Sequence, residues 1–145
     1  MKQRVNIEQS LPHAWKAMYA LSVSLGKTSL TPIQQHLIKI RVSQINSCAF
    51  CINMHTKEAL AIGETQQRIF VLSAWKETNL FTPEEKAILA ITEEVTLIHQ
   101  HGISDETYQQ AEIFFSAETI GDIIMATISM NGWNRIAVST HLQFN

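Results

Sequence analysis

Residues 43–55 read SQINSCAFCINMH and contain both cysteines of the 145-residue chain. In this stretch Cys51 follows Cys48 by three residues, and His55 follows Cys51 by four. On a helix of 3.6 residues per turn, these spacings place all three side chains on one narrow stripe. The segment therefore predicts a helical site that combines two thiols with an imidazole.

Each group in this stretch has a chemical use. The thiolate is the nucleophilic form of cysteine, and a free thiol ionises near pH ~8.5. A helix N-terminus stabilises a thiolate, which favours Cys48 as the reactive cysteine. A neighbouring histidine can take the proton of a thiol, which favours Cys51. The second cysteine can trap a sulfenic acid as a disulfide. This combination is typical of a peroxidase or a disulfide-exchange enzyme.

Two other interpretations of the cysteines are open. A buried free cysteine often serves only as a small apolar residue. A Cys-x-x-Cys pair is also half of many zinc sites, and His55 together with His36 could complete a set of four ligands. The chain has no second Cys-x-x-Cys and no His-x-x-x-His, so we expect neither a metal nor another cofactor.

Most of the remaining sequence has helical periodicity, and no stretch alternates with a period of two. The clearest helix start is Thr82-Pro83-Glu84-Glu85, a capping box with proline at the first helical position. The pairs Thr31-Pro32 and Asn46-Ser47 also indicate helix boundaries, whereas the tail after Gly132 is ambiguous. We expect an all-α fold, in which residues 1–145 form a single-domain helical bundle of roughly seven helices.

Composition limits the classes of function. Hydrophobic residues make up 46% of the chain, charged residues 17%, and the net charge is −2, without a basic stripe. These values argue against extended disorder and against a nucleic-acid partner. No apolar run is long enough to span a membrane, and the N-terminal residues lack a signal-peptide pattern, so we expect a cytoplasmic protein. The apolar residues recur around the helices, which favours a homo-oligomer.

The chain resembles the carboxymuconolactone decarboxylase family, and within it the alkylhydroperoxidase D-like branch. The resemblance covers nearly the whole chain. It rests on Arg41-Val42-Ser43-Gln44-Ile45-Asn46, Cys48-Ala49-Phe50-Cys51, His55, Glu58-Ala59, Gly63-Glu64, Ala74-Trp75, the helix start between Phe81 and Glu94, and Asn131-Gly132-Trp133-Asn134-Arg135.

This resemblance implies an all-helical fold that assembles into trimers or hexamers and reduces hydroperoxides. It implies that Cys51 is the peroxidatic cysteine, that Cys48 resolves it as a redox-active disulfide, and that His55 belongs to a proton relay. It also implies an external dithiol reductant, either a lipoyl-bearing or a thioredoxin-like protein.

The chain departs from the family pattern at two positions. Family members usually have a glutamate twelve residues before the first cysteine, where this chain has His36. A neutral imidazole can also accept a proton, so we expect His36 to serve as a base near the thiols, unless it is a core histidine bonded to the backbone. The second departure is Phe50, which stands where the best-known peroxidases of this type have a histidine.

Two other functions fit the same resemblance. The first is decarboxylation of a lactone acid, although the decarboxylase branch typically lacks the cysteine pair. The second is a non-enzymatic redox sensor whose disulfide alters a partner surface. Sustained consumption of peroxide distinguishes the enzyme from the sensor, because a sensor is oxidised once per cycle.

Overall fold

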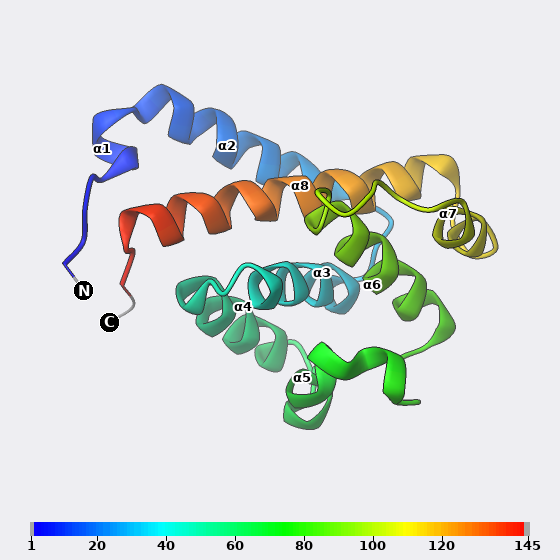
Figure 1. The fold of residues 1–145 in the computed structure, drawn as a ribbon. Helices are drawn as coiled ribbons and strands as arrows, with labels where there is room; N and C mark the ends of the chain where they lie inside the picture. Colours follow the sequence, from blue (N-terminus) through cyan, green and yellow to red (C-terminus); the bar gives the residue numbers. More distant parts are fainter. Residues whose placement is uncertain (1, 144–145) are drawn as a thin grey trace.

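The computed structural model describes residues 2–143, which form eight α-helices and two short 3-10 helices without any strand (Figure 1). The all-α prediction is confirmed, with one α-helix more than expected. The elements are α1 (Ile7–Ser10), α2 (Pro12–Ser24), η1 (Leu25–Lys27), α3 (Pro32–Ile45), α4 (Ala49–Ala61), α5 (Gln66–Val71), η2 (Leu72–Glu77), α6 (Pro83–Thr96), α7 (Asp105–Glu112) and α8 (Ala117–Thr140).

Helix α3 lies at the centre and packs against α4, α6 and α8 (Figure 1). It is apolar on opposite sides, and Ile38 and Val42 belong to the cluster that contains the cysteines and α8. Leu37 and Ile40 belong to a second cluster that contains α5 and η2. None of these four side chains is more than 1% exposed, so α3 is buried as its two apolar stripes predict.

The helix starts predicted at two threonine–proline pairs are confirmed. The side chain of Thr82 caps α6 by accepting a hydrogen bond from the backbone N–H of Glu85, whose carboxylate accepts from Thr82 N–H. Thr31 and Gln34 form the same reciprocal pair at the start of α3. Each box satisfies two backbone donors at a helix end, where they lack partners within the helix.

The apolar spacing after Thr82 predicts a helix that ends at Gly102, but α6 ends earlier, at Thr96. The Glu94 carboxylate accepts hydrogen bonds from Ser104 N–H and from the Thr107 hydroxyl, which folds the chain back before the glycine. The short helix α1 has weak sequence periodicity and begins at Asn6, whose side chain caps it.

Helix α8 continues through the tail that was ambiguous in sequence and ends at His141, a residue with φ of 54°. Gly132 lies inside this helix, where α2 approaches it closely. A Cβ atom at position 132 would lie 2.8 Å from the terminal methyl carbon of Met18. Gly132 therefore does not end the helix, and a side chain at this position would require the flexible end of Met18 to shift.

A buried polar network connects α8 to the end of α3. Asn134 is fully buried, and its side-chain N–H donates to the Ser43 hydroxyl at 3.0 Å. The Asn46 amide donates to Asn134 Oδ1 at 3.0 Å and to Asn131 Oδ1 at 2.9 Å. These bonds fix the turn that precedes Cys48, since both Ser43 and Asn46 belong to that turn.

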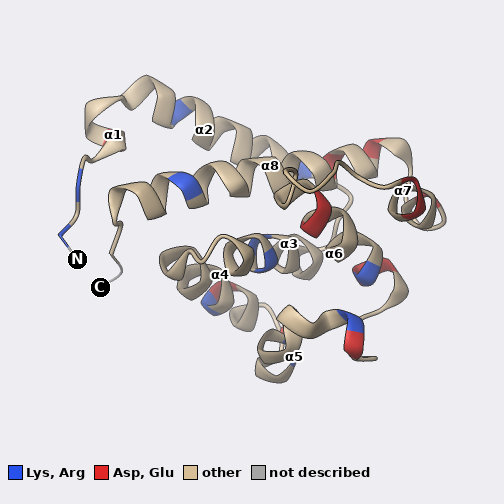
Figure 2. Ribbon diagram, viewed as in Figure 1, with Lys and Arg blue, Asp and Glu red and all other residues tan. Residues whose placement is uncertain are grey.

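Among residues 2–143, the positions of Lys and Arg are scattered over different helices in Figure 2 and form no stripe. Glu93 of α6 accepts hydrogen bonds from Arg41 of α3 and from the indole of Trp75, each at 2.8 Å, so it connects helices away from the cysteines. Within residues 2–143, no helix is both long and apolar enough to cross a membrane.

The Asn134 network gives a prediction about stability. Asn134→Ala should lower the free energy of unfolding by about 2 kcal/mol, because it removes two buried hydrogen bonds. The exposed Asn79→Ala substitution is the matched control and should stay within about 0.5 kcal/mol of wild type. Denaturant unfolding at one protein concentration measures both, and equal stabilities would show that the network does not stabilise the fold.

Candidate active site

The cysteine segment begins with a tight turn between α3 and α4. Ser47 has a φ of 53°, and its N–H donates to the Gln44 carbonyl, while Cys48 N–H donates to the Ser43 carbonyl. This is a Schellman motif in which serine occupies the left-handed position that glycine usually takes. Helix α4 is capped by Cys48, whose Sγ accepts from Cys51 N–H at 3.3 Å, and not by the Asn46-Ser47 pair.

Cys48 and Cys51 are joined by a disulfide in the structure, and their Cα atoms are 5.4 Å apart. They are 1% and 2% exposed. The bond closes across a single helical turn, which is the geometry that their spacing predicts. Because the bond links two residues of one turn, it adds no long-range connection to the fold.

A cavity of about 580 Å³ lies between α2, α3, α4 and α8, and Cys51 and His55 form part of its wall. Cys48 does not line it. Among the lining groups, Lys39 is the only lysine or arginine and Glu8 the only carboxylate. The rest of the wall is mainly apolar and aromatic, with Trp15, Tyr19, Leu25, Phe50, Met54, Met130, Trp133, Ile136 and Leu142 among its residues.

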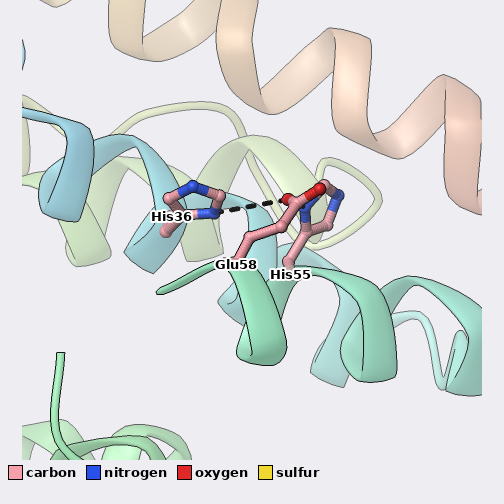
Figure 3. Close-up of side chains that lie close together, drawn as sticks. All are labelled: His36, His55 and Glu58. Atoms are coloured by element: carbon pink, nitrogen blue, oxygen red, sulfur yellow. Dashed lines mark hydrogen bonds and ion pairs between the residues drawn. The ribbon is translucent and has the colours of Figure 1, made fainter. Parts of the chain in front are cut away.

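Three side chains converge one turn beyond the cysteines, His36 from α3 and His55 and Glu58 from α4 (Figure 3). His55 Nδ1 is hydrogen-bonded to Glu58 Oε2 at 2.8 Å, and His36 Nδ1 lies 3.8 Å from the same oxygen. The two imidazole centroids are 5.9 Å apart. The chain therefore folds back at Ser47 and brings His36 beside His55, as the sequence predicts.

Burial controls the protonation of this cluster. The pKa of His36 is lowered to about 4, mainly by burial and also by the Lys39 charge and His55, while Glu58 acts in the opposite direction. Burial also lowers the pKa of His55, and the hydrogen bond that its Nδ1 donates to Glu58 partly opposes this effect. Both imidazoles are consequently neutral at neutral pH, so each can accept a proton.

His36 is not a core histidine bonded to the backbone through Nδ1. That nitrogen is buried and has no hydrogen-bond partner. The side chain is 14% exposed and faces Glu58, whose own side chain is 48% exposed. In a structural histidine this nitrogen would be hydrogen-bonded to the backbone. In His36 it is directed at the Glu58 carboxylate instead.

Two residues of the site were not singled out from the sequence. Glu58 was quoted only as part of the family resemblance, and Lys39 was not considered. Both lie three residues after a predicted histidine, Glu58 after His55 and Lys39 after His36, a spacing that places side chains on the same helix face. Burial lowers the pKa of Lys39, and Glu58 raises it.

Among residues 2–143, one cluster has the ligand atoms to hold a metal ion, and it consists of His36, His55 and Glu58, with all three atoms within 4.8 Å of one another. This is not the cysteine site considered from the sequence, because both sulfurs are engaged in the disulfide.

Comparison with known proteins agrees with this arrangement. The model of the carboxymuconolactone decarboxylase family matches residues 9–94. The chain belongs to this family. An uncharacterised protein of Bacillus subtilis (strain 168), YdfG, is 40% identical over 139 residues, which cover 96% of this chain and 95% of that protein.

Solved structures of related proteins have the same fold. A protein of unknown function from Agrobacterium tumefaciens, described as a candidate antioxidant defence protein AhpD, is 38% identical with a TM-score of 0.95 and 99% of each chain covered. A peroxidase-related protein from Ralstonia eutropha JMP134, with an alkylhydroperoxidase AhpD core, is 18% identical with a TM-score of 0.84. That match covers 95% of this chain and 74% of the other. The alkylhydroperoxidase D-like resemblance found in the sequence is thus confirmed.

Proposed function

We propose that the chain is a thiol-dependent peroxidase that reduces hydrogen peroxide or organic hydroperoxides in antioxidant defence. One observation carries the proposal. Cys51 is disulfide-bonded to Cys48 at the start of α4, and it lines an apolar cavity together with His55. The Agrobacterium relative, described in terms of antioxidant defence, supports the same conclusion.

In the proposed reaction the Cys51 thiolate attacks the terminal oxygen of a hydroperoxide. The O–O bond breaks, the sulfur becomes a sulfenic acid, and the alkoxide leaves as an alcohol with a proton from His55. The Cys48 thiol then attacks the Cys51 sulfur and releases water, which forms the disulfide. An external dithiol returns both cysteines to thiols and becomes a disulfide itself.

Accessibility supports the assignment of the attacking cysteine. Cys51 lines the cavity, whereas Cys48 is 1% exposed and does not. A peroxide that enters the cavity meets Cys51 first. The apolar wall suits the alkyl part of an organic hydroperoxide, and the exclusion of water strengthens the electrostatic effect of Lys39 on a nearby anion.

The relay that we propose consists of His55 and Glu58, with His36 in support. Because Nδ1 of His55 is bonded to Glu58, its Nε2 is left to exchange a proton with Cys51. The carboxylate stabilises the imidazolium that results. In this chain Glu58 supplies the carboxylate of the relay, and His36 occupies the position of the glutamate that the resemblance implies.

The reductant we propose is a lipoyl-bearing or thioredoxin-like protein, with a cytoplasmic location where such dithiols are kept reduced. We also propose a homo-oligomer, a trimer or hexamer. Apolar side chains are exposed on α8 and α2, and the most prominent are Met125, Ile128, Val138, Tyr19 and Val23.

The first prediction concerns the two cysteines. Cys51→Ser should abolish peroxide reduction, whereas Cys48→Ser without added dithiol should consume about one equivalent per chain and stop at the sulfenic acid, which has no resolving thiol within the chain. Peroxide consumption measures this, and wild type is also assayed with a panel of dithiol donors. A wild-type protein that also stops after one equivalent with every donor would be a redox sensor.

The second prediction concerns the relay. In a Cys48→Ser background, Glu58→Gln should raise the pH at which the Cys51 thiolate forms, because the imidazolium loses its carboxylate. His36→Ala should produce a smaller rise in the same background. With both cysteines present, His36→Glu should keep much of the peroxidase activity, with Lys39 offsetting the added charge. Ultraviolet absorbance of the thiolate measures the titration.

The control for the relay is His13→Ala, which removes an exposed histidine of α2. It should change neither the titration nor the rate of peroxide reduction. A thiolate titration that stays at the wild-type pH in Glu58→Gln and His36→Ala would assign both residues a structural role only.

The third prediction concerns assembly. Wild type should scatter as a trimer or hexamer at micromolar concentration, and Ile128→Glu should dissociate it, because the charge would enter an apolar interface. Small-angle scattering measures the mass. Tyr108→Glu, which changes an apolar side chain on α7 with 37% exposure, is the control. A monomeric wild type would contradict the proposal.

A further inference from the structure

The cluster of His36, His55 and Glu58 has a geometry that the proposed relay does not require. A relay from His55 to Glu58 needs one hydrogen bond, yet a second imidazole is directed at the same carboxylate oxygen from a different helix. Its Nδ1 is buried without a hydrogen-bond partner. A buried nitrogen in this condition costs free energy unless a ligand satisfies it.

We propose that His36, His55 and Glu58 form an open three-ligand site for a divalent transition-metal ion of the zinc class. Two imidazoles and one carboxylate, with a fourth position left to water, are a ligand set that such ions accept. The site differs from the closed, cysteine-containing zinc site considered from the sequence, because no sulfur takes part. The proposed peroxide reduction needs no metal ion, although it uses the same three residues.

The distances suit the ion. Ligand atoms about 2.1 Å from a tetrahedral zinc stand about 3.4 Å apart. The observed separations from Glu58 Oε2, 2.8 Å to His55 Nδ1 and 3.8 Å to His36 Nδ1, lie on either side of that value. All three ligand atoms are within 4.8 Å of one another, so small side-chain rotations close the site.

The surroundings provide access and also limit the affinity. The Glu58 side chain is 48% exposed, which gives an ion a path from solvent to the buried nitrogens. The Lys39 ammonium opposes a second cation, because its charge reaches both imidazoles. A bound ion would occupy the histidine lone pairs, so it would inhibit peroxide reduction if the proposed relay is correct.

The experiment measures metal binding alone, on untagged full-length protein with the disulfide intact, so that no thiolate competes. Titration with Co²⁺, followed by its visible absorption, should show one ion per chain, and Zn²⁺ should displace it. His36→Ala and Glu58→Gln should each weaken binding about tenfold or more. Lys39→Gln should tighten it about threefold or more, because a repulsive charge is removed.

His13→Ala is the control and should bind as wild type does. Glu58→Gln changes a half-exposed side chain, and circular dichroism establishes that each variant is folded. Affinities that are unchanged in both ligand variants, weaker binding by Lys39→Gln, or no saturable Co²⁺ binding would overturn the proposal. The Co²⁺ titration contains no peroxide, so its result does not depend on whether the protein is a peroxidase. A failed Co²⁺ titration likewise leaves the proposed peroxidase activity untouched.

Discussion

The fully buried amide of Asn134 holds α8 to the turn between α3 and α4. It donates to Ser43 and accepts from Asn46, so the end of α3, where the turn begins, is bonded to a helix distant in sequence. A polar group buried this deeply is tolerated only when its partners are in place. Next to these bonds, the N–H groups of Ser47 and Cys48 donate to α3 carbonyls, and Ser47 takes a left-handed conformation that serine rarely adopts. The position of the cysteine helix relative to the core depends on this set of interactions.

The candidate site follows from the direction that this turn gives the chain. Since α4 folds back along α3, His36 and His55 face each other although they are nineteen residues apart in the sequence. Helix α8 forms another wall of the cavity, and Gly132 faces the flexible end of Met18 from α2. The cavity that Cys51 lines is thus bounded in part by α8, whose Asn134 is bonded to the end of α3.

Local signals in the sequence were sufficient for the helices and for part of the site. The capping boxes and the three- and four-residue spacing of Cys48, Cys51 and His55 act within one helix, so their geometry is fixed by the helical repeat. The tail after Gly132 was ambiguous because a glycine near the end of a helical pattern often marks the end of the helix. Glu58 and Lys39 could have been found from their spacing to the histidines, but charged residues on an amphipathic helix usually face solvent. Only the packing of α4 on α3 distinguishes them from such residues.

In the sequence, the helix N-terminus favoured Cys48 as the attacking thiolate, whereas the neighbouring histidine favoured Cys51. The structure shows that each cysteine has one of these two features. Cys48 caps α4 and accepts the N–H of Cys51, which stabilises negative charge on its sulfur, whereas Cys51 lies in the cavity wall with His55. In the reaction we propose, these properties are used at different steps. The reacting peroxide and the incoming dithiol both need the accessible sulfur of Cys51. When the dithiol attacks Cys51, the sulfur that leaves is Cys48, and a leaving thiolate is favoured where a helix N-terminus stabilises it. In the proposed cycle, His55 thus assists the attack of Cys51 on the peroxide, and the helix N-terminus assists the departure of Cys48 when the disulfide is reduced.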